Sequence, residues 1–135
     1  MGEWTVRTDN RGFTLIELLI VVVIIGILVS IVVPKFANGK ERAMVSAMRS
    51  DLHNLVTAQE AYYTNGLTYY NGPVPDPAFS YNVSENVTVT LVNVTSSGWG
   101  ATATHSGSTR TCSVYVGSGG PVGPATLEGA PACTP

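Results

Sequence analysis

The chain has 135 residues and a formal net charge of −2 at pH 7, with seven basic and nine acidic side chains. That length allows one small domain beyond a membrane segment, and so weak a charge indicates no particular partner. In residues 65–135, Arg110 is the only basic residue, against Asp76, Glu85 and Glu128. The chain therefore lacks a basic patch in this region, and we expect no direct binding of nucleic acid.

An apolar segment follows a short polar start. Between Phe13 and Val33 the only charged residue is Glu17, and a helix over 13–33 would span roughly 30 Å, about one bilayer core. A lone carboxylate there costs about 2.5 kcal/mol or more, so it needs a partner. The segment has no Lys, Arg or His. Cleavage after Gly12 would supply a partner, the new α-amino group of Phe13, from the same helix or from a neighbouring chain.

The run Gly12-Phe13-Thr14-Leu15-Ile16-Glu17 resembles the class III signal motif of type IV pilins and the related pseudopilins. The similarity continues through residues 34–36 and roughly through 50–55, which is somewhat less than half of the chain. The resemblance implies that a prepilin peptidase cuts after Gly12 and N-methylates Phe13, and that Phe13 and Glu17 act in assembly. The alternative is an ordinary signal anchor with a stray Glu.

The resemblance also implies a function and a location. Residues 1–12 would be a cytoplasmic leader, and the mature chain would be a single-pass inner-membrane protein before it enters an extracellular pilus. Its partners would be copies of itself, the prepilin peptidase/methyltransferase and the inner-membrane assembly machinery. The filament would serve roles such as adhesion, twitching motility or DNA uptake, and the chain would not be an enzyme.

Two other functions remain open. A major pseudopilin of a type II secretion system has nearly the same N-terminal half, but such proteins typically carry an acidic calcium site near the C-terminus. Here Glu128 is the only acidic residue of that region, which also contains two cysteines. This composition favours a pilin. A membrane-anchored binding or catalytic head is the third candidate, and no catalytic constellation supports it.

The helix is expected to continue past the apolar segment. Pro34 removes a backbone donor and Gly26 weakens the helix, so a kink or a melted stretch between them is plausible. A simple proline kink explains the free subunit nearly as well, whereas the resemblance implies unwinding from Gly26 to Pro34 in assembled pili. An amphipathic stripe then predicts helix to about Thr64, and Asn65 or Gly66 suits a left-handed helix end.

Residues 65–135 read as a β-sheet head. A loop rich in Gly and Pro covers 65–86, and apolar residues then alternate with polar ones over 87–91, 99–104 and 112–116. Short turns between these strands predict an antiparallel meander whose apolar face covers the helix. The predicted fold is therefore α+β, with a long helix over 13–64, a head over 65–135, and a tail from Gly117 that shows no strand period.

The two cysteines permit one disulfide. A bond between Cys112 and Cys133 would tie the tail to the last strand, and it would resemble the disulfide-bounded C-terminal loop common in pilins. Two free thiols or a metal pair are the alternatives. His53 and His105 lie in no metal or catalytic spacing, so we expect no metal and no cofactor.

Two weaker patterns lie in or near the head. Asn82, Asn86 and Asn93 each begin an N-glycosylation pattern, although chance matches are frequent in so Asn- and Thr-rich a segment. Tyrosines gather around the helix end at positions 62, 63, 69 and 70. Electron transfer has been proposed for related pilins, but we interpret this cluster as packing of the loop on the helix.

Overall fold

The computed structural model describes residues 1–2 and 12–135, so most of the expected leader lies outside the described residues. Its elements are one helix, α1 (Leu15–Gly66), and four strands, β1 (Val87–Val92), β2 (Gly98–His105), β3 (Thr111–Gly117) and β4 (Ala132–Cys133). This arrangement confirms the predicted α+β fold. The chain divides into two units, Met1–Asn38 with the first part of α1, and Gly39–Pro135 with the rest of α1 and the sheet.

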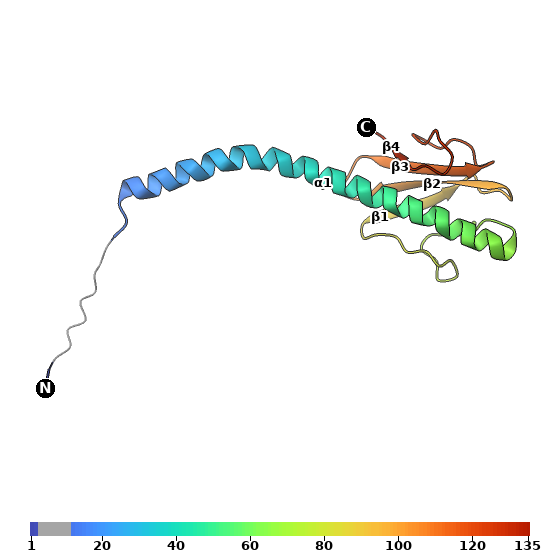
Figure 1. Ribbon diagram of the computed structural model, residues 1–135, viewed down its shortest axis with the longest axis horizontal. Helices are drawn as coiled ribbons and strands as arrows, with labels where there is room; N and C mark the ends of the chain where they lie inside the picture. Colours follow the sequence, from blue (N-terminus) through green and yellow to red (C-terminus); the bar gives the residue numbers. More distant parts are fainter. Residues whose placement is uncertain (3–11) are drawn as a thin grey trace. The chain divides into compact units, whose positions relative to one another are not determined.

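The sheet is an antiparallel meander with the strand order β1-β2-β3-β4. Figure 1 shows the strands side by side, with the second part of α1 running along them. The three predicted strands are confirmed. The prediction of a tail without strand structure was wrong, because Cys133 pairs with Cys112 and Ala132 pairs with Ser113 across β3 and β4. A two-residue strand is too short to produce a visible alternation.

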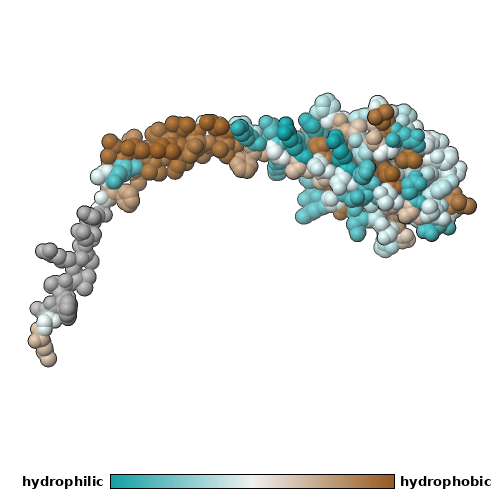
Figure 2. All heavy atoms as spheres, viewed as in Figure 1, coloured by the Kyte–Doolittle hydropathy of each residue, from teal (hydrophilic) through white to brown (hydrophobic). Residues whose placement is uncertain are grey.

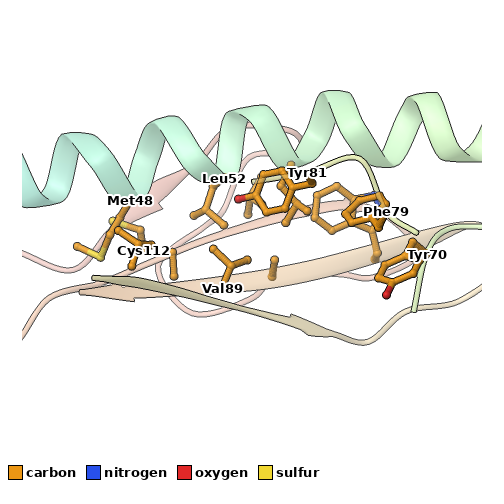
Figure 3. Close-up of a cluster of buried hydrophobic side chains, with 13 residues drawn as sticks. Met48, Leu52, Tyr70, Phe79, Tyr81, Val89 and Cys112 are labelled. Atoms are coloured by element: carbon orange, nitrogen blue, oxygen red, sulfur yellow. The ribbon is translucent and has the colours of Figure 1, made fainter. Parts of the chain in front are cut away.

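The core lies between the second part of α1 and the inner face of the sheet. Met48, Leu52 and Leu55 recur on one helical face and are fully buried. In Figure 3 Met48 and Leu52 point from α1 toward Val89 and Cys112 of the sheet. The central strand β2 offers the small residues Ala101 and Ala103, both fully buried. Small side chains in β2 leave room for the larger helical side chains, so the two layers interlock.

The outer face of the sheet is partly covered as well, which the alternating pattern did not predict. Ser113 points away from α1, yet it is fully buried. Its hydroxyl donates to the carbonyl of Val122 and accepts the backbone N–H of Ala125 at 3.2 Å. Ala125 is itself fully buried. The tail therefore packs on β3, and the polar residue on the outer face of that strand holds it there.

The helix ends at Gly66, and the left-handed residue is Leu67, one position after the two that the sequence predicted. The N–H of Leu67 donates to the carbonyl of Tyr63 at 2.8 Å, and Leu67 itself has a φ of 55°. Neither Asn65 nor Gly66 is among the residues with positive φ, so that prediction was wrong. The Leu67 side chain is exposed, and the following chain turns back toward α1 through a buried Tyr70.

Candidate assembly site

The start of α1 forms a closed set of hydrogen bonds around Glu17. The Glu17 carboxylate accepts the backbone N–H of Thr14 at 2.9 Å and the Thr14 hydroxyl at 2.8 Å. In return, the Glu17 N–H donates to the Thr14 hydroxyl at 3.4 Å. This is a capping box, in which residues three apart satisfy each other's unpaired groups at a helix N-terminus. The negative charge also lies at the positive end of the helix dipole.

The capping box changes the account of Glu17 in one respect. The sequence pattern was interpreted with the α-amino group of Phe13 as the partner of Glu17, and the hydroxyl and N–H of Thr14 within the same turn were overlooked. The signal was present, because Thr14-Leu15-Ile16-Glu17 matches the capping-box pattern. Hydrogen bonds lower the energy of the carboxylate in the single chain, but they leave its charge unneutralised. A cation is therefore still the stronger partner in an apolar medium.

The first part of α1 exposes almost all of its apolar surface. The large apolar side chains from Phe13 to Val33 are between 43% and 86% exposed. Figure 2 shows them as a continuous apolar stretch on the visible face of the helix. The helix contains an 18-residue window of mean hydropathy 3.3, so it is long and apolar enough to cross a membrane. Surface of this kind needs lipid or other helices around it.

Gly26 and Pro34 both lie within α1, which is helical without a break from Leu15 to Gly66. Pro34 has no N–H, so the carbonyl of Ser30 lacks its helical donor there. The Ser30 hydroxyl donates to the carbonyl of Ile27 at 2.7 Å and does not replace that bond. The single chain therefore shows no melted stretch, and unwinding between Gly26 and Pro34 stays a prediction for the assembled state.

Two polar side chains on the buried stripe of α1 hold the head against the helix. Asp51, 3% exposed, accepts the N–H and the hydroxyl of Ser84 at 3.0 and 2.8 Å. Gln59, fully buried, accepts the N–H of Tyr70 at 2.9 Å and donates to its carbonyl at 3.0 Å. Each side chain therefore fixes the backbone of the loop that leads from α1 to β1. The amphipathic pattern of the sequence predicted the helix here but neither of these two roles.

The tyrosine cluster packs this same loop, as the interpretation of the sequence proposed. The rings of Tyr70 and Phe79 stack with centroids 4.4 Å apart, and Tyr62 meets both rings edge-on. The Tyr70 hydroxyl donates to Asp76 at 2.7 Å. Burial first, and then this hydrogen bond and the charge of Asp76, raise the pKa of Tyr70 to about 12. Tyr70 therefore stays neutral at ordinary pH, and its hydroxyl can donate a hydrogen bond while its ring packs in the core.

Cys112 and Cys133 form a disulfide between β3 and β4. Next to it, the Thr111 N–H donates to the Thr134 hydroxyl at 3.1 Å and the Thr134 N–H donates to the Thr111 carbonyl at 2.9 Å. The bond encloses the tail that covers β3. The alternatives of free thiols or a metal pair do not fit this pairing.

Known proteins match this chain most specifically at its N-terminal part. A family model described as a prokaryotic N-terminal methylation motif matches residues 7–33. The type IV major pilin PilA of Myxococcus xanthus is 49% identical over 55 residues, which are 41% of this chain and 25% of that protein. The type II secretion system core protein G of Pseudomonas aeruginosa is 36% identical over 63 residues, 47% of this chain and 44% of that protein.

One relative extends into the head. The type IV wide pilus major component PilA4 of Thermus thermophilus is 32% identical over 102 residues, which cover 75% of this chain and 78% of that protein. Identity over this length reaches beyond the signal motif that pilins share with secretion proteins. It agrees with a fold in which one long helix packs on an antiparallel sheet. The chain therefore belongs to the type IV pilin family.

Proposed function

We propose that the chain is a structural subunit of a type IV pilus and not an enzyme. The exposed apolar part of α1 carries this proposal, because nothing in the described part of its own chain covers it. In a membrane, lipid covers that surface, and in a filament the same helices of neighbouring subunits replace the lipid. The head, whose own core is buried, then forms the outer surface.

Cleavage after Gly12 would prepare the helix to leave the lipid and join the helices of neighbouring subunits. Gly12 and Phe13 lie exposed before the helix, and a Cβ at position 12 would meet no atom of the described residues within 4 Å, apart from its immediate neighbours in the chain. The requirement for glycine there accordingly lies with the peptidase, which must approach the backbone closely. Cleavage would free the amine of Phe13, and N-methylation would keep its positive charge. That amine would pair with Glu17 of a neighbour in the filament.

The direct test compares cells that make the wild-type chain with cells that make Gly12→Val. We expect the variant to stay in the membrane as an uncleaved precursor and to give no filaments in electron micrographs. Gly2→Val, a change in the leader away from the cut, is the matched control and should be processed normally. Mature protein beginning at Phe13 in the Gly12→Val cells would contradict the proposal.

The second candidate is a pseudopilin of a type II secretion system. Core protein G of P. aeruginosa aligns with less than half of this chain, whereas the T. thermophilus pilus component aligns through most of it. The described residues also contain no cluster of acidic side chains that fits a metal ion. Deletion of the chain distinguishes the two functions, because loss of surface pili indicates a pilin and loss of protein secretion with intact pili indicates a pseudopilin.

A further inference from the structure

A groove of about 630 Å³ runs along the head between α1 and the loop that precedes β1. Its helical side is one face of α1, on which Asn54, Ala58, Ala61 and Asn65 recur at three- and four-residue steps. At about 1.5 Å per residue, this face is roughly 16 Å long. The two alanines keep this wall flat, so a ring-shaped group can lie against it.

The rest of the lining combines aromatic and amide groups. Phe79 and Tyr81, 2% and 5% exposed, close the bottom of the groove but offer a ligand almost no ring surface. Tyr62, on α1 and 37% exposed, packs edge-on to Phe79 at 5.9 Å and is the aromatic side chain that the groove leaves accessible. Asn82 stands on the loop side of the groove, opposite the amides of the helix. Aromatic surface with a few convergent polar groups is typical of small-ligand sites, and this volume lies in their range.

The polar groups of the groove are neutral and largely unused. The Asn65 amide donates to the Ala61 carbonyl at 3.1 Å, whereas the Asn54 and Asn82 side chains are exposed and make no hydrogen bond with the described residues. No charged side chain is among the described residues that line the groove. It therefore offers nothing to neutralise an anionic or a cationic ligand. An amide donates and accepts at adjacent atoms, which suits neighbouring hydroxyl groups.

We infer that this groove binds a neutral oligosaccharide. Such a ligand presents an apolar ring face to Tyr62 and uncharged hydroxyls to the amides of Asn54 and Asn82, so it matches both kinds of group that the groove exposes. An extended peptide is disfavoured, because peptides in this conformation pair with a strand edge, and here the walls are a helix and a loop. The inference concerns the head alone and does not depend on filament assembly.

The test uses the full-length mature subunit in zwitterionic detergent, because a glycoside detergent would compete for the groove. The protein is applied to an array of neutral and acidic oligosaccharides, and the affinity for the best retained sugar is then measured in solution. We expect retention on neutral sugars. Asn54→Ala and Asn82→Ala should each weaken binding about fivefold, the effect of one lost hydrogen bond.

Ala61→Leu should reduce binding by more than tenfold, because it fills the groove while it keeps the helix propensity. Asn71→Ala, an exposed asparagine outside the groove, should bind as the wild type does, and unfolding curves should show that all variants are folded. The inference is overturned if no neutral sugar is retained, if acidic sugars are preferred, or if Ala61→Leu binds normally. Self-association that Ala61→Leu abolishes, without sugar binding, would make a second copy of the chain the occupant.

Discussion

Gln59 is the residue whose removal should loosen the head most clearly. Its amide is fully buried and makes two hydrogen bonds with the backbone of Tyr70, at 2.9 and 3.0 Å. Gln59→Met keeps the length and most of the volume of the side chain but removes both partners. The Tyr70 N–H and carbonyl would then be buried without hydrogen bonds, at a cost of about 1–3 kcal/mol each.

Part of this loss is offset because a methionine is more favourable than an amide in an apolar core. We therefore expect Gln59→Met to lower the free energy of unfolding by about 2–4 kcal/mol. The assay is urea unfolding of the mature chain in detergent, followed by near-ultraviolet circular dichroism, which reports on the aromatic cluster near Tyr70. Hydrogen exchange of the Tyr70 amide should also become faster.

The matched control is His53→Met, on an exposed position of the same helix. It should change the free energy of unfolding by less than about 0.5 kcal/mol. The reasoning is refuted if Gln59→Met is as stable as this control, or if the Tyr70 amide remains protected in it.

Three further predictions concern the loop and the tail. Asp51→Ala should destabilise the head by about 1–3 kcal/mol in urea, since it removes both hydrogen bonds between the buried Asp51 carboxylate and Ser84, and a stability equal to wild type would contradict this. Hydrogen bonds from the Ala78 N–H and then from Tyr70 lower the pKa of Asp76 from its ordinary 3.8. The ionised Asp76 therefore contributes fully to the stability of the loop above that pH, and this contribution is lost in stronger acid. Burial and the hydrogen bond to Asp76 raise the pKa of Tyr70 to about 12, so the neutral tyrosine stabilises the loop below pH 10.0 and this stabilisation is lost toward about pH 12. A free energy of unfolding of the head that changes at neither extreme of pH would argue against these shifts. Cys133→Ser should lower stability by roughly 3 kcal/mol and expose the tail to proteases with α1 intact; an unchanged digestion pattern would count against this role.

The sequence predicted the elements whose pattern is local and periodic. The apolar segment, the amphipathic helix and the three longer strands each repeat a spacing over several residues, and the alternation in β2 correctly placed Trp99, Ala101 and Ala103 in the core. Two features without a local pattern were missed. The strand β4 depends on its pairing with the distant β3, and the left-handed Leu67 is neither a glycine nor an asparagine.

The residues that we propose for assembly show what a local spacing can predict. Phe13 and Glu17 were proposed as partners because one turn of helix separates them. The capping bond of Glu17 to Thr14 was readable from the sequence and was overlooked. The roles of Asp51 and Gln59 were not readable, because their partners Ser84 and Tyr70 lie in a loop without periodicity.

The central claim is that the Glu17 carboxylate receives the Phe13 amine of a neighbouring subunit. Its most direct test measures membrane-embedded mature subunit and sheared filament separately in cells that make Glu17→Val. The account predicts normal cleavage and a normal or larger membrane pool, because the helix becomes more apolar, but no filament. The unpaired amine would cost several kcal/mol, a loss of about 10³-fold or more in subunit affinity.

Thr14→Val is the control, since it removes the hydroxyl of the capping box and keeps the carboxylate. It should still give filaments, because the charge pair remains. If Glu17 pairs only within its own chain, Glu17→Val should instead reduce the membrane pool as well. A normal yield of sheared filament from Glu17→Val cells would contradict the account.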